Sequence, residues 1–70
     1  MQIHPVTSSN IATVAWEDGT LYLTFNKGGH YAYESVPKST FERMLKAESV
    51  GKFFHAEIRD KFVTRLLTNA

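Results

Sequence analysis

Three tyrosines are the side chains of this sequence best suited to bind a ligand. Tyr31 and Tyr33 are separated by Ala32, so an extended strand places both rings on one face. Two rings on one face form a flat aromatic platform of the kind on which bases stack in sheet-based RNA binders. Tyr22, which precedes them in the chain, would join that platform. The alternative is that the pair consists of half-buried packing residues with solvated hydroxyls.

The turn before this tyrosine pair decides which face the rings occupy. If residues 27–28 form a two-residue loop, Tyr33 faces Tyr22 and Tyr31 faces Thr24, on the open face of a sheet. If the loop has one residue more, both rings turn towards the core, beside the apolar residues of the preceding strand. The two glycines that follow Lys27 allow either loop, so both registers stay open at this point.

Basic residues gather in the second half of the chain. Residues 1–37 hold one Lys against three acidic residues, whereas residues 38–70 hold seven Lys and Arg against four acidic residues. Lys52, Arg59 and Lys61 would contact phosphates if this half meets a nucleic acid. The alternative is that these charges only keep two helices in solution.

Neither a metal site nor a catalytic site is predicted. His4, His30 and His55 are the only imidazoles, none lies four residues from another, and there is no Cys. A zinc site needs three or four convergent ligands, and nucleophilic catalysis needs a base and an orienting group held together. The serines precede turns or helices, where capping explains them. We therefore expect no cofactor, no metal and no enzymatic activity.

The elements that would position these residues are those of an α+β domain. Val, Ile and aromatic residues alternate in two stretches joined by Asp18-Gly19, a favoured hairpin turn. A three-stranded antiparallel meander is expected, followed by two helices packed on one face (βββαα). The chain is expected to be a single domain. A polar lead-in without secondary structure (residues 1–10) precedes the meander (11–34) and the two helices (37–62). The tail (63–70) either extends the last helix or returns as an edge strand.

The hairpin turn also assigns the two faces of the sheet. One face is expected to form the core, with Trp16 among the most buried side chains: Ala12, Val14, Trp16, Leu21, Leu23 and Phe25. The other face is half-polar: Ile11, Thr13, Ala15, Tyr22 and Thr24. Ser49 is expected to cap the second helix, and Gly51 to ease a close approach between the two helices.

Several short motifs, taken in order, resemble the KTSC domain family. They span nearly the whole chain: Ser8-Ser9-Asn10-Ile11, Leu21 with Phe25, Gly29-His30-Tyr31-Ala32-Tyr33, Val36-Pro37, Ala47 to Phe54, and Ile58-Arg59. The family comprises domains of about this length found after lysyl-tRNA synthetases and alone in bacterial and phage proteins. The resemblance implies a small accessory module, for which RNA binding has been suggested. The tyrosine pair is the central mark of the family, and His55 stands where relatives tend to have Asn.

Two binding functions follow as expectations. The first is an accessory domain for RNA or another single-stranded nucleic acid, in which Tyr31 and Tyr33 stack on bases. The alternative is a protein-interaction module that uses a sheet edge or aromatic patch, including association with a second copy of itself. No stretch approaches the roughly 18 apolar residues of a membrane span, and residues 1–10 do not read as a secretory signal. A cytoplasmic protein without a membrane partner is therefore expected.

Overall fold

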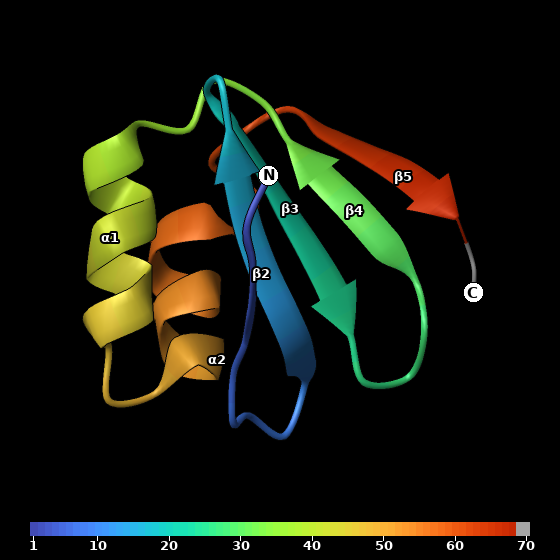
Figure 1. Ribbon diagram of the computed structural model, residues 1–70, viewed down its shortest axis with the longest axis vertical. Coiled ribbons are helices and arrows are strands. Elements are labelled where there is room, and N and C mark those ends of the chain that lie inside the picture. Colours follow the sequence, from blue (N-terminus) through green and yellow to red (C-terminus); the bar gives the residue numbers. More distant parts are fainter. Residues whose placement is uncertain (69–70) are drawn as a thin grey trace.

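A computed structural model describes residues 1–68 and has an α+β architecture, which confirms the predicted fold class. Five antiparallel strands form one sheet in the order β1-β2-β3-β4-β5 (Figure 1). The strands are β1 (Ile3–Pro5), β2 (Ile11–Glu17), β3 (Thr20–Phe25), β4 (His30–Tyr33) and β5 (Thr64–Thr68). The helical segments are α1 (Lys38–Lys46), α2 (Val50–Phe53) and a π-helical continuation of α2, η1 (Phe54–Ile58). No helix of residues 1–68 combines the length and apolar character needed to cross a membrane.

The β2–β3 hairpin has the predicted turn. Asp18 and Gly19 both have positive φ, at 50° and 86°, as a type I′ turn requires. The turn pairs Trp16 with Leu21 and Val14 with Leu23, as predicted.

A β-bulge at the start of β2 corrects the predicted faces. The register shifts between Ile11, opposite Phe25, and Thr13, opposite Thr24, so that Ala12 is the additional residue. Because the bulge reverses the alternation, Ile11 lies in the core and is 0% exposed, while Ala12 is half-buried. The prediction had placed Ala12 on the core face and Ile11 on the half-polar face.

The turn between β3 and β4 takes the longer of the two predicted forms. The Gly28 N–H donates to the Phe25 carbonyl (2.9 Å), and the Phe25 N–H donates to the Gly29 carbonyl (3.1 Å). Both glycines have φ near +90°, a conformation that costs glycine little. The resulting register places Tyr33 opposite Leu21 and Tyr31 opposite Leu23, on the core side of the sheet.

Two edge strands enlarge the predicted meander. Ile3–Pro5, within the lead-in that was expected to lack structure, forms β1 and pairs with β2. Pro5 is tolerated there because an edge strand has an unpaired side. The tail returns to pair with β4 as β5, which settles the alternative left open for residues 63–68; residues 69–70 of that tail lie outside the described residues.

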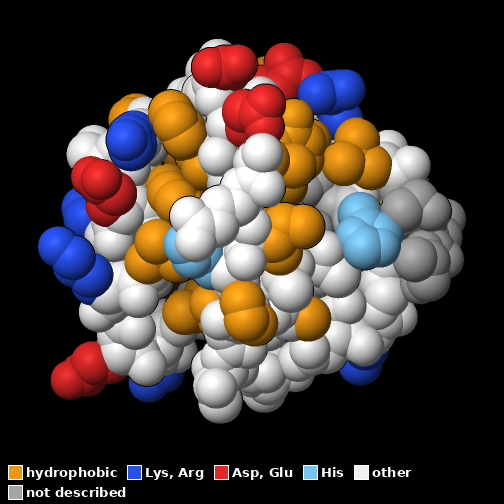
Figure 2. Space-filling model, viewed as in Figure 1, with side chains coloured by type: hydrophobic (Ala, Val, Ile, Leu, Met, Phe, Trp, Pro, Cys, Tyr) orange, Lys and Arg blue, Asp and Glu red, His pale blue; other side chains and the backbone are white. Residues whose placement is uncertain are grey.

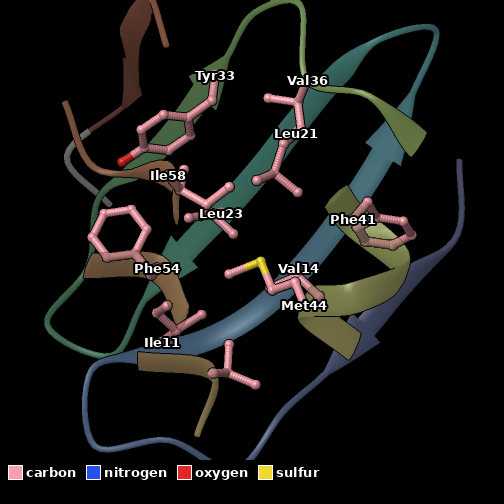
Figure 3. Close-up of a cluster of buried hydrophobic side chains, with 11 residues drawn as sticks. Ile11, Val14, Leu21, Leu23, Tyr33, Val36, Phe41, Met44, Phe54 and Ile58 are labelled. Carbon is pink, nitrogen blue, oxygen red and sulfur yellow. The ribbon is translucent and has the colours of Figure 1, made fainter. Parts of the chain in front are cut away.

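The core lies between the sheet and the helical segments. Figure 3 shows apolar side chains from β2, β3, β4, α1, α2 and η1 converging in one cluster, in which Val36 and Met44 are almost wholly buried. Trp16 is only half-buried, so the prediction of deep burial was wrong. The planes of the Trp16 and Phe41 rings are inclined by 20°, and their centroids lie 6.4 Å apart. The Trp16 indole N–H donates to the Val36 carbonyl (2.8 Å). An indole needs such a partner when it leaves water, and Trp16 finds one at the margin of the core.

The helices end earlier than predicted. α1 ends at Lys46 rather than at residue 48, and η1 ends at Ile58 rather than at residue 62. Ser49 caps α2 as predicted, since its hydroxyl accepts the Lys52 N–H (3.2 Å).

Candidate functional site

Three segments form a groove at one end of the sheet. They are the loop between β1 and β2 and the β3–β4 loop, which lie at the lower end of the molecule in Figure 1, and the segment α2–η1, which begins near that end and runs upward. The groove comprises two cavities of about 300 Å³ and about 450 Å³. Asn10 and His55 line both cavities, so the two adjoin at these residues.

Hydrogen bonds fix the loop that forms one wall of this groove. The Ser8 hydroxyl accepts the N–H groups of Asn10 (3.2 Å) and Ile11 (3.3 Å). The Asn26 side chain donates to the Ser8 carbonyl (2.8 Å), and the Asn26 N–H donates to the Asn10 carbonyl (2.8 Å). The two loops therefore hold each other, and Asn10 is anchored through both its N–H and its carbonyl.

Gly51 lies beside this loop. A Cβ atom at Gly51 would lie 3.4 Å from the Ser8 hydroxyl oxygen and 4.0 Å from the Asn10 side-chain nitrogen, both ordinary van der Waals distances. Neither neighbour belongs to α1, so the prediction that Gly51 eases a close approach between the two helices is wrong.

The smaller cavity, hereafter the aromatic cavity, has a wall of two phenyl rings and a polar rim. Phe25 and Phe54 meet edge to face at 5.5 Å. The Arg59 guanidinium nitrogen Nη1 lies 3.3 Å from His55 Nδ1, which accepts its N–H when the imidazole is neutral. The full lining is Asn10, Phe25, Lys27, Phe54, His55 and Arg59.

The larger cavity, hereafter the hydroxyl cavity, is rich in hydrogen-bonding groups. Among residues 1–68, Lys52 is the one Lys or Arg that lines it and Glu48 the one carboxylate. Four hydroxyl-bearing residues line it: Thr7, Ser8, Ser9 and Ser49. Hydroxyls together with one ammonium group are suited to an anion of modest charge.

The three tyrosines do not form one platform. Tyr22 lies opposite Ala15 and Ala32 on the face that the helices leave open, whereas Tyr31 and Tyr33 lie on the core side. The prediction that Tyr22 joins the pair is therefore wrong, because the three-residue β3–β4 loop shifts the register by one residue.

Tyr33 behaves as a core residue. It is 5% exposed and meets Phe54 edge to face at 5.8 Å. Burial, and next the neighbouring Tyr31 hydroxyl, raise the pKa of Tyr33 to about 12, against the opposing effect of the Arg59 charge. Tyr31 is half-buried and meets Phe25 edge to face at 5.4 Å. The pair therefore supports the wall of the aromatic cavity from behind.

The predicted basic residues separate in space. Lys52 lines the hydroxyl cavity and Arg59 the aromatic cavity, whereas Lys61 is exposed after η1 and lines neither. The sequence reasoning missed Lys27, which it read only as part of a turn, and did not assign Asn10 or His55 to a site. The signal that could have found Asn10 was the Ser8-Ser9-Asn10 motif of the resemblance, which the fold places against Gly51.

Charge is distributed unevenly along the strands. Glu17, Asp18 and Glu34 lie at the end of the sheet that carries the β2–β3 turn, and Figure 2 shows acidic side chains grouped at that upper end. Glu17 lies 3.5 Å from the N-terminal amine, and Arg65 pairs with Glu34. The groove, lined by Lys27, Lys52 and Arg59, lies towards the opposite end, so the two ends of the sheet differ in charge.

The open face of the sheet carries a third cavity, of about 310 Å³. No Lys, Arg, Asp or Glu lines it, and exposed apolar residues of the two edge strands, Ile3 and Leu67, lie at its sides. Thr24 and His30 form a hydrogen bond (2.8 Å) at its floor. Figure 2 shows hydrophobic side chains gathered around the N-terminal segment on the face viewed. This surface suits an apolar partner better than a nucleic acid.

Within residues 1–68, no three His, Asp or Glu side chains lie close enough together to hold a metal ion. The expectations of no metal and no catalysis remain predictions.

Comparisons with known proteins identify relatives of this chain. A family model described as the KTSC domain matches residues 7–62. A curated protein from Tsukamurella paurometabola is 34% identical over 62 residues, which cover 86% of this chain and 92% of that protein. The crystal structure of KTSC domain protein YPO2434 from Yersinia pestis superposes with a TM-score of 0.91 at 33% identity, covering 96% of this chain and 97% of the other.

Proposed function

The chain belongs to the KTSC domain family, and we propose that it is a non-enzymatic module that binds single-stranded RNA, in the cytoplasm, through the groove. One observation carries the proposal. Lys27, Lys52 and Arg59 come from three places in the chain and line two adjoining cavities, one of which has an aromatic wall. Cationic grooves with aromatic surfaces are the means by which proteins bind single strands without a duplex.

The proposed binding site is the groove and not the ring faces of Tyr31 and Tyr33, on which bases were expected to stack. Tyr33 is buried and both tyrosines lie on the core side of the sheet, so neither offers a ring face for stacking on the open side. Phe25 is the half-buried member of the aromatic wall and is the ring that a base would contact. Tyr31 and Tyr33 then contribute indirectly, by holding Phe25 and Phe54.

The test is binding of a short, fluorescently labelled single-stranded RNA, measured by anisotropy over a range of salt concentrations. Each phosphate contact in a single strand contributes about −0.7 to the slope of log affinity against log salt. Replacing Lys27, Lys52 or Arg59 with Ala should each weaken binding and flatten that slope by about 0.7. Lys61→Ala should have a smaller effect, because Lys61 lines neither cavity.

Lys38→Ala is the matched control. Lys38 is exposed in the first turn of α1, outside both cavities of the groove. Equal losses from Lys38→Ala and Lys52→Ala would show that binding depends only on net charge and would refute the groove. Absence of binding at low salt would refute the proposal altogether.

The open face favours a second candidate, a protein-interaction module. Ile3 and Leu67 line the open-face cavity and are each about half or more exposed, on the two edge strands of the sheet. Exposed edge strands with apolar side chains pair readily with other chains, including copies of the same chain. Sedimentation at increasing concentration tests self-association. A protein that stays monomeric and captures no partner through this face would exclude this candidate.

A further inference from the structure

The two cavities of the groove differ in chemistry in the way that the two halves of a nucleotide do. The aromatic cavity offers the Phe25 and Phe54 rings. The hydroxyl cavity offers four hydroxyl-bearing residues and Lys52, whose charge is balanced by the Glu48 carboxylate. A base is planar and binds by stacking and by hydrogen bonds along its edge. A phosphate binds to ammonium groups, hydroxyls and N–H donors.

We infer that the groove holds one nucleotide unit, with its base in the aromatic cavity, its phosphate in the hydroxyl cavity and the base edge read by Asn10. The inference deepens the proposed function, on which it rests. At about 300 Å³ the aromatic cavity is at the small end of ligand pockets, so it takes one base rather than a stack. The nucleotide can be free or part of a strand, since both present the same base and phosphate.

Asn10 is placed to read the base because its backbone is fixed and its side chain is free. Its N–H donates to the Ser8 hydroxyl, and its carbonyl accepts the Asn26 N–H. Within residues 1–68 its side-chain amide makes no hydrogen bond, although it lies where the two cavities meet. A side-chain amide presents an acceptor beside a donor, which matches the adjacent donor and acceptor of adenine, N6 and N7.

Gly51 lies beside that amide. A Cβ atom at position 51 would lie 4.0 Å from the Asn10 side-chain nitrogen, an ordinary van der Waals distance. His55 lies at the same junction. When its Nδ1 accepts the Arg59 N–H, its Nε2 carries the proton and donates. Asn10 would therefore bind the edge of the base, and the His55 Nε2 N–H would donate a hydrogen bond between the base and the phosphate.

The test is an NMR titration of the isotope-labelled chain with AMP, adenosine, UMP and inorganic phosphate. AMP should shift amides of both cavities, at residues 50–52 and 54–59, and should bind at least about fivefold more tightly than phosphate, the lower limit of a stacking contribution. Adenosine should shift only residues of the aromatic cavity. UMP, whose N3–H and O4 also present a donor beside an acceptor, should bind by the same contacts but more weakly than AMP, because its smaller ring stacks over less of the aromatic wall.

Variants at Asn10 test the reading of the base. Asn10→Ala should weaken the binding of both AMP and UMP and leave phosphate binding unchanged. Asn10→Asp should also weaken AMP, because its carboxylate lacks the donors and repels the phosphate. Gln2→Ala is the matched control, since it removes an exposed amide outside both cavities. Melting temperatures should be unchanged, because the Asn10 side chain makes no hydrogen bond within residues 1–68.

The outcomes separate this inference from the proposed function. If a short RNA binds at low salt but AMP shifts no groove amide, the nucleotide site is wrong and RNA binding stands. If adenosine binds as tightly as AMP, the phosphate does not occupy the hydroxyl cavity, and the inference also fails. If neither RNA nor AMP binds, both proposals fail.

Discussion

Raising the pH should destabilise the protein through Tyr33. The phenol is 5% exposed and packs against Phe54, and its pKa is raised from 10.0 to about 12. Burial is the main cause, because a phenolate in the core would lose its hydration. In the unfolded chain the same phenol returns to its ordinary pKa.

The sign and size of the effect follow from these two values. The folded state retains the Tyr33 proton over a range in which the unfolded state releases it, so alkaline pH favours unfolding. The contribution is complete below pH 10 and is lost as the pH rises from about 10 to about 12. A shift of about two units corresponds to roughly 2–3 kcal/mol in the free energy of unfolding. A loss of this size is a large share of the stability of a small domain.

Urea unfolding of the wild type and of Tyr33→Phe at several alkaline pH values measures this contribution. The variant keeps the ring and lacks the ionisable hydroxyl, so the alkaline loss of the wild type should exceed that of the variant by about the same 2–3 kcal/mol. The comparison cancels the titration of the lysines, which both proteins share. Identical pH profiles would mean that Tyr33 is solvated, and the tyrosine pair would again be a candidate platform for bases.

Three further predictions concern the turns and the margin of the core. Trp16→Phe should lower the free energy of unfolding by about 1–3 kcal/mol, because the Val36 carbonyl loses its indole donor. Circular dichroism during urea unfolding measures this loss, and an unchanged midpoint would show that the hydrogen bond contributes nothing. Gly19→Ala should cost about 1–2 kcal/mol through its positive φ alone, since nothing lies within 4 Å of the added Cβ. Gly29→Ala should cost more by the same assay, because its Cβ would also approach Tyr31 Cε1 to 3.2 Å, and equal costs would contradict that contact.

The parts of the fold that were predictable depend on local chemistry. Asp18-Gly19 fixes the β2–β3 register because few other sequences adopt positive φ at two consecutive positions. Ser49 was predictable as a cap because a hydroxyl before a helix accepts an otherwise unpaired N–H. Both features depend on residues within a few positions of each other.

The parts that were not predictable depend on partners distant in sequence. The bulge at Ala12 exists because Ile11 must reach the core opposite Phe25, and no signal near Ile11 carries that requirement. β1 forms only because β2 offers it an edge, and a three-residue strand ending in Pro has no strong pattern of its own. The position of the tyrosine pair depended on one residue of loop length, which Gly28 and Gly29 left undecided.

The groove was only partly predictable, for the same reason. Lys52 and Arg59 were identified from the charge of the second half of the chain, and the fold places each in one cavity. Lys27 and Phe25 come from the first half, whose net charge is negative, and only the fold brings them beside Arg59. Asn10 depends on the contact between its loop and Gly51.

The most direct test of RNA binding through the groove is to map the binding surface by NMR while a short single-stranded RNA is added at low salt. If RNA binds in the groove, the amide signals of residues 8–10, 26–28 and 50–59 should shift together and reach saturation with one affinity. Shifts concentrated instead at Thr13, Tyr22 and His30, on the open face of the sheet, would contradict the groove as the binding site.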